Sequence, residues 1–281
     1  MCDLRSPPTF KNMPSKEGKL MFSRHQIHPS SIRVWRGFRN EKYAADREGF
    51  VSKLEDVFIP LTCQAMMPIG LRSYIPTLLN SSSADVPDEV ALVGYADQDT
   101  YYAASRNTVI GKAYGMLHYE VFSFDSTDGN PASQSAFPVF YPGNVLKRSQ
   151  PYFFSGKSLD WSDKTVSLFV IPTRDNMPAC EQLSARLASS LVAAVARSSV
   201  SEAILVDDPG CLTIWIATNA KQTVPPDIQS VLSTISGVIT SVSVAQEVPH
   251  MWAENEAGIK VSDNETLNLK LESSSSLRSV S

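Results

Sequence analysis

Residues 203–217 read AILVDDPGCLTIWIA. The two apolar runs are typical of buried strands and the Asp-Asp-Pro-Gly between them has turn chemistry, so the stretch predicts a β-hairpin. A strand at 166–171 and a helix at 177–197 are predicted before it, and a helix from Pro225 and a strand at 241–248 after it. This β-α-β-β-α-β order is that of a split βαβ unit, in which two helices cover one face of a four-stranded antiparallel sheet.

The first half of the chain repeats this order. A strand at 32–38 is followed by a helix with Asp46 as its N-cap, which Pro60 ends or kinks. Strands at 71–79 and 90–95, a helix capped by Asp97 or Asp99, and a final strand at 117–124 complete the unit. Each sheet keeps one apolar face uncovered. We therefore expect the two sheets to pack against each other within one chain, with a ligand chamber between them.

The predicted organisation has five parts. A polar N-terminal arm (1–30) leads into the first ferredoxin-like unit (31–124), and a connector (125–163) joins it to the second unit (164–252). The polar tail (253–281) is expected to be partly disordered. The connector carries aromatic residues that we expect to be mostly buried, because exposed they would form an apolar patch: Phe137, Phe140, Tyr141, Tyr152, Phe153 and Phe154.

The order, the element lengths and the tandem duplication resemble the dimeric α+β barrel superfamily. The most typical part is PDEVALVGY, residues 87–95, with the helix after it. The resemblance covers roughly residues 31–248 and implies an α+β fold, two ferredoxin-like units packed sheet to sheet as an intramolecular α+β barrel. The superfamily contains cofactor-free monooxygenases, isomerases, polyketide cyclases, haem-binding enzymes and stress proteins, so it leaves the function open.

Composition narrows the partners and the compartment. The chain has 281 residues, 43% hydrophobic and 19% charged, and a formal net charge of −4, which argues against a nucleic-acid partner. We find no apolar run that could span a bilayer, and the start, MCDLRSPPTF, lacks a signal region. The four cysteines are far apart and are expected to be free thiols in a cytoplasmic protein: Cys2, Cys63, Cys180 and Cys211. The sequence leaves the oligomeric state open.

His118, within AYGMLHYE (113–120), is the strongest candidate for chemistry. A strand at 117–124 would place His118 and Glu120 on one face, where the carboxylate could fix the imidazole tautomer for general acid or base catalysis. Tyr119 could donate a hydrogen bond to a substrate oxygen. We predict these three as catalytic residues. The alternative for His118 is a half-buried histidine with a structural hydrogen bond.

The first strand offers substrate-binding groups. Alternation places Arg36 on the same face as Ile32 and Val34, so its guanidinium could hold a carboxylate or enolate in the chamber. An arginine extending to solvent at the sheet edge is the alternative. Trp35 and Tyr95 complete the predicted substrate-binding set.

Cofactor motifs are absent from the sequence. There is no GxGxxG, GxxxxGK[ST], GxSxG or HExxH, and the SGKS at 155–158 lacks the upstream glycine of a phosphate loop. His25 and His28 lack partners for a metal site, so no metal is expected. The superfamily's haem-binding branches imply haem, with His118 as axial ligand, as a further alternative.

The expected function is an enzyme that acts on a small, largely apolar organic molecule by acid–base chemistry without a tightly bound cofactor. Its class would be isomerase, cyclase, lyase or cofactor-free oxygenase. The alternatives are a non-catalytic small-molecule-binding or interaction protein of the same fold, and a haem-dependent enzyme.

Overall fold

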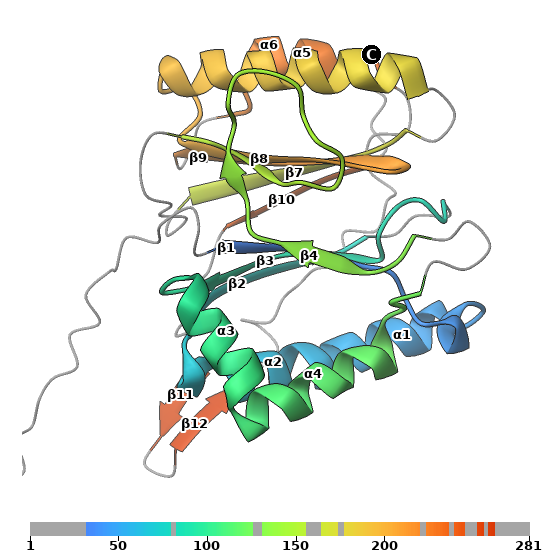
Figure 1. The fold of residues 1–281 in the computed structure, drawn as a ribbon, viewed down its shortest axis with the longest axis vertical. Helices are drawn as coiled ribbons and strands as arrows, with labels where there is room; N and C mark the ends of the chain where they lie inside the picture. Colours follow the sequence, from blue (N-terminus) through green and yellow to red (C-terminus); the bar gives the residue numbers. More distant parts are fainter. Residues whose placement is uncertain are drawn as a thin grey trace, which may run out of the picture.

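The chain folds into four layers, two helical layers outside and two sheets inside (Figure 1). The computed structural model describes residues 32–79, 83–125, 131–155, 164–173, 177–219, 223–235, 239–244, 252–255 and 258–261. Helices α5 and α6 cover one sheet, and α1 to α4 cover the other (Figure 1). Among the described helices, none is long and apolar enough to cross a membrane.

The first sheet has the strand order of a ferredoxin-like unit. It consists of β1 (Ile32–Gly37), β2 (Leu71–Leu78), β3 (Glu89–Tyr95) and β4 (Gln134–Ala136), arranged β2-β3-β1-β4 with antiparallel neighbours. Strand β1 pairs along its whole length with β3, from Ile32 opposite Gly94 to Gly37 opposite Glu89.

The first helical segment begins where the sequence predicts. The Asp46 side chain accepts a hydrogen bond from the Gly49 amide and caps α1 (Arg47–Lys53). A π-helical turn (Leu54–Phe58) then leads into α2 (Ile59–Met66), so the helical path continues past Pro60. Because a π turn interrupts the regular hydrogen-bond ladder, it accommodates a proline that lacks the amide donor.

The strand predicted at 117–124 is wrong. Helix α3 (Gln98–Asn107), capped by Asp97, is followed by α4 (Val109–Val121), and the fourth strand of the sheet is β4 from the connector. Thr108 caps α4 by accepting a hydrogen bond from the Gly111 amide at 2.8 Å. Tyr114, Leu117 and Val121 recur at helical spacing, so the segment carries a helical period as well as the alternation that favoured a strand.

The second unit follows the predicted order closely. It consists of β7 (Lys164–Pro172), α5 (Met177–Ala196), β8 (Glu202–Asp208), β9 (Cys211–Asn219), α6 (Pro226–Leu232) and β10 (Ile239–Val244). The predicted hairpin is confirmed, and its turn places Gly210 at a φ of +90°, a conformation that glycine adopts readily. The last strand begins two residues earlier than predicted, and residues 245–248 lie outside the described residues.

The connector is part of both sheets. Besides β4, it supplies β5 (Val139–Phe140) and β6 (Tyr152–Phe154), which extend the second sheet to the order β10-β7-β9-β8-β6-β5. The three aromatic residues of β6 are buried, Phe137 and Tyr141 are half-buried, and Phe140 is exposed. Where the predicted second unit meets the predicted tail, β11 (Trp252–Asn255) and β12 (Gly258–Val261) form a hairpin.

The two sheets pack face to face, as predicted. Their inner faces share one core of buried side chains that includes Ile32, Val34 and Leu92 from the first sheet and Val166, Ile204 and Trp215 from the second. For the described residues the predicted chamber between the sheets is wrong, because these large side chains fill a gap that is typically about 10 Å wide.

Candidate functional site

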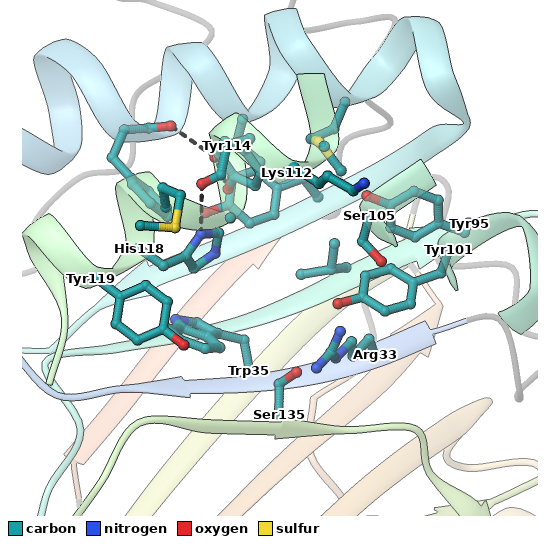
Figure 2. A pocket seen from close by; sticks show the side chains of 18 of the residues that line it. Arg33, Trp35, Tyr95, Tyr101, Ser105, Lys112, Tyr114, His118, Tyr119 and Ser135 are labelled. Carbon is teal, nitrogen blue, oxygen red and sulfur yellow. Dashed lines mark hydrogen bonds between the residues drawn. The ribbon is translucent and has the colours of Figure 1, made fainter. Parts of the chain in front are cut away.

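A cavity of about 500 Å³ lies inside the first unit, between the outer face of the first sheet and helices α2, α3 and α4 (Figure 2). Strand β1 explains its position. Ile32 and Val34 point into the core between the sheets, so Arg33 and Trp35 point the opposite way, toward the helices. Much of the wall is apolar, with side chains that include Phe58, Met66, Val93 and Phe124.

His118 lies on α4 among aromatic rings. Its ring centroid is 4.7 Å from that of Tyr114, 4.9 Å from Phe58 and 5.5 Å from Trp35. Its Nδ1 is 3.1 Å from the Tyr114 carbonyl oxygen. Because a carbonyl only accepts, Nδ1 carries the proton and Nε2 keeps its lone pair. Burial lowers the pKa of His118 to about 4, against the effect of this hydrogen bond, so the imidazole is neutral at pH 7.

Glu89 lies at the start of β3 and is fully buried. Its Oε1 accepts a hydrogen bond from the Tyr74 hydroxyl at 2.9 Å, and its Oε2 accepts one from Trp35 Nε1 at 2.8 Å. Burial raises the pKa of Glu89 to about 7, although both hydrogen bonds act to lower it. The carboxyl group therefore titrates near neutral pH.

Trp35 contacts both titratable groups. Its Nε1 donates to Glu89, and its ring meets that of His118 edge to face, at an interplanar angle of 80°. The desolvating cavity disfavours the charged form of each group, so it raises the pKa of the acid and lowers that of the base. Their order is the reverse of that in water, where a glutamate loses its proton at lower pH than a histidine.

Arg33 provides a fixed positive charge. Its Cζ lies 4.3 Å from the centroid of the Tyr101 ring, a cation–π contact. Burial lowers the pKa of Arg33 to about 10, which leaves it charged at neutral pH. Figure 2 shows the Arg33 and Tyr101 side chains apart from His118 and Tyr119.

Four of the six predicted site residues line this cavity: Trp35, Tyr95, His118 and Tyr119. Tyr119 is the most exposed of them, and its ring packs against Phe124 at 4.6 Å.

Glu120 does not line the cavity. Because 117–121 is helical, a two-residue step turns the side chain to roughly the opposite side of α4 from His118. Glu120 is exposed and pairs with Lys42 at 3.0 Å. The predicted His118–Glu120 pair on one face is therefore wrong.

Arg36 also lies outside the cavity. Its side chain enters the core between the sheets, where Nε is 2.8 Å and Nη2 is 3.2 Å from the two carboxylate oxygens of Asp208 on β8. Its side chain is only 1% exposed. The carboxylate that its guanidinium was predicted to hold belongs to the second unit of the same chain.

Glu89 was not among the predicted site residues, although it lies in the quoted segment 87–95. It is in phase with Ala91, Val93 and Tyr95 along β3, so it shares their helix-facing side. A carboxylate in that phase of an otherwise apolar strand was the available signal. For metals, the described ranges contain no group of three His, Cys, Asp or Glu residues that could hold an ion, and His25 and His28 lie outside them.

Comparisons with known proteins give distant structural likenesses only. No protein family and no curated protein sequence matches the chain. Among solved structures, it is similar to a candidate monooxygenase from Lactobacillus acidophilus, with 7% identity and a TM-score of 0.35 over 77% of this chain and 93% of that one. It is also similar to a candidate monooxygenase from Fusobacterium nucleatum, with 7% identity and a TM-score of 0.38 over 77% of this chain and 91% of that one. An anthrone oxidase-like protein has 8% identity and a TM-score of 0.30 over 76% of this chain and 90% of that one. Likeness at this level does not bear on activity.

Proposed function

We propose that this protein is an enzyme that moves a proton on a small, largely apolar organic molecule bound in the cavity of the first unit. The observation that carries the proposal is Glu89, a buried carboxyl group with a pKa of about 7 in the wall of an apolar cavity. A general acid or base works best when its pKa lies near the working pH. Strongly shifted groups in clefts are also candidates for functional sites.

Glu89 and His118 have separate roles in this proposal. The Glu89 carboxylate takes the proton from an acidic C–H or O–H bond, whose electron pair stays on the ligand, and later returns the proton. His118 accepts a hydrogen bond from a ligand hydroxyl at Nε2, the nitrogen that the Tyr114 contact leaves unprotonated. With a pKa of about 4 it is the weaker base, so it takes a proton only from a more acidic hydroxyl. The net reaction would be of the isomerase, cyclase or lyase type, or of the cofactor-free oxygenase type if the deprotonated ligand reacts with dissolved O₂ as the oxidant.

Solvent hydrogen exchange tests proton transfer without knowledge of the natural substrate. Loss of the α-proton signals of 2-tetralone and 2-indanone in D₂O, followed by NMR, measures proton abstraction directly. We expect the protein to accelerate exchange, with a rate that rises with pH and levels off above about 7, because the base is active when deprotonated. Glu89→Gln should slow exchange by about a hundredfold or more.

His118→Ala should change the exchange of these two ketones little while leaving the fold intact, because neither ketone carries a hydroxyl that could donate to His118 Nε2. Glu120→Gln is the matched control, since Glu120 is exposed and outside the cavity. Full exchange activity in folded Glu89→Gln protein would refute the proposed role of Glu89.

A non-catalytic binding protein is the second candidate. One observation favours it: both Glu89 oxygens already accept hydrogen bonds, as those of a purely structural buried carboxyl would. Binding of these ketones without accelerated exchange would support that function. An absorbance spectrum of the purified protein with a Soret band would instead support the haem alternative.

A further inference from the structure

We propose that Arg33 is the receptor for a carboxylate group, so that the cavity takes small apolar carboxylic acids. This inference rests on the proposed function in one respect, since both place the ligand in the same cavity. It goes further by naming the ligand's charged group and the side chain that binds it.

Arg33 has no acidic partner within the part of the chain that the structure describes. Three other arginines there are paired: Arg36 with Asp208 at 2.8 Å, Arg39 with Asp88 at 3.1 Å and Arg197 with Asp227 at 2.7 Å. Arg33 makes no such ion pair, and its buried Nε has no hydrogen-bond partner. Because buried donors are normally satisfied, this nitrogen indicates a place for an acceptor that is not part of the chain.

The surroundings of Arg33 prepare it for a planar anion. Tyr101 covers one face of the guanidinium, which leaves the N–H groups along its edge to donate in the plane. Two parallel N–H donors match the two oxygens of a carboxylate. The charge persists at neutral pH, and a buried charge without a partner is destabilising, so a bound carboxylate would remove an existing penalty.

Other cavity residues favour a single negative charge on an apolar body. Lys112 is exposed, and the other polar side chains near this end include the hydroxyls of Tyr95, Tyr101, Ser105 and Ser135. A phosphate dianion would need more fixed positive charge than one guanidinium, and an ionised Glu89 in the same cavity would oppose a second negative charge. The aromatic and aliphatic walls suit a hydrocarbon or aromatic body, and about 500 Å³ is within the usual range for small-molecule sites.

The test compares isosteric ligands on the full-length protein. Titration calorimetry measures the affinities of 2-naphthoate, 2-naphthamide and 2-naphthyl phosphate at pH 6.5. We expect the wild-type protein to bind the carboxylate at least tenfold more tightly than the amide, and more tightly than the phosphate. Arg33→Gln should bring the ratio of the affinities for the carboxylate and the amide close to one. Arg33→Lys should keep part of the preference, because the positive charge remains while the two parallel N–H donors of the guanidinium are lost.

Arg106→Gln is the matched control. Arg106 also stacks on a tyrosine at 4.3 Å, that of Tyr102, but it is exposed and does not line the cavity. The proposal is overturned if the wild-type protein shows no preference for the carboxylate, if the phosphate binds more tightly, or if the preference survives in folded Arg33→Gln protein. If Arg33→Gln does not fold, the ratio of the two affinities in the wild-type protein and its decrease in Arg33→Lys still test the proposal. The Glu89→Gln variant distinguishes the two proposals. Loss of hydrogen exchange tests the proposed function, and 2-naphthoate binding that persists in this variant supports the role of Arg33 independently.

Discussion

At the scale of single residues, Glu89 and His118 make folding stability depend on pH in opposite directions. The folded protein holds the Glu89 proton between pH 4.5 and about 7, where the unfolded chain has lost it. The stabilisation that protonated Glu89 gives the folded state is therefore complete below pH 4.5 and is lost as pH rises from there through about 7. Folded His118 stays neutral between pH 6.5 and about 4, where the unfolded chain gains a proton, so its contribution is lost as pH falls through that range. The two slopes oppose each other between pH 4.5 and 6.5.

Replacing Glu89 by Gln isolates one of these slopes. Glutamine resembles the protonated acid, since its oxygen can accept from Trp35 while its amide donates to the Tyr74 hydroxyl. The difference in unfolding free energy between Glu89→Gln and the wild type should therefore shift in favour of the variant by up to about 3 kcal/mol from pH 4.5 to 7.5. Urea denaturation at several pH values measures it. A difference that stays constant over this range would contradict a raised pKa of Glu89.

Four of the six predicted site residues could be found from sequence because aromatic and histidine side chains are conspicuous, although His118 and Tyr119 lie on helix α4 and not on the predicted strand. Glu89 and Arg33 were not assigned to the site, since their importance comes from desolvation and from the absence of partners. Both properties depend on which side chains of distant elements surround them, and strand alternation does not reveal that.

At the scale of elements, helix α4 positions the site and shows where periodicity is ambiguous. Residues 117–124 alternate over a few positions, yet the longer run from Thr108 carries an N-cap and a helical stripe. A short window favours a strand, and only the full length of about three turns resolves the choice. The hairpin of the second unit has no such ambiguity, because its turn chemistry and strand residues agree.

Two glycines of α4 should respond oppositely to alanine. A Cβ on Gly111 would collide with the Ala104 carbonyl oxygen of α3, whereas a Cβ on Gly115 would meet nothing within 4 Å. Gly111→Ala should destabilise the protein by about 1–3 kcal/mol, and Gly115→Ala should stabilise it by about 0.5–1 kcal/mol. Urea denaturation of the two variants measures both. Equal effects would show that α3 and α4 are not packed as closely as described.

At the scale of the whole molecule, the tandem order predicted two sheets packed together, but it did not predict where the cavity lies. Side-chain volumes decide which space is filled. Trp215, Leu92 and Phe153 fill the space between the two sheets, while the cavity remains between the first sheet and α4. The ion pair of Arg36 and Asp208 crosses the filled interface. It joins the two units through two hydrogen bonds in a desolvated environment.

A double-mutant cycle tests this contact between the units. Arg36→Met or Asp208→Asn alone should destabilise the protein by about 3–5 kcal/mol, because each leaves a buried charge without its counter-ion. The loss of unfolding free energy in the double variant should be clearly smaller than the sum of the losses in the two single variants. Affinity for 2-naphthoate should be unchanged in folded Arg36→Met protein, since Arg36 does not line the cavity. Additive losses, or weakened naphthoate binding, would contradict this assignment.

The same contact bears on how the protein is made. Arg36 and Asp208 are separated by 172 positions in the chain. A ribosome that adds about 5–20 residues per second needs about 10–35 s to synthesise that length. In the part of this interval after β4 (Gln134–Ala136) has been made, the inner sheet face of the nascent first unit is uncovered, and exposed apolar surface of this kind is prone to aggregation. The second unit covers this apolar face once it has been synthesised and has folded. The speed of translation therefore sets how long the face stays exposed.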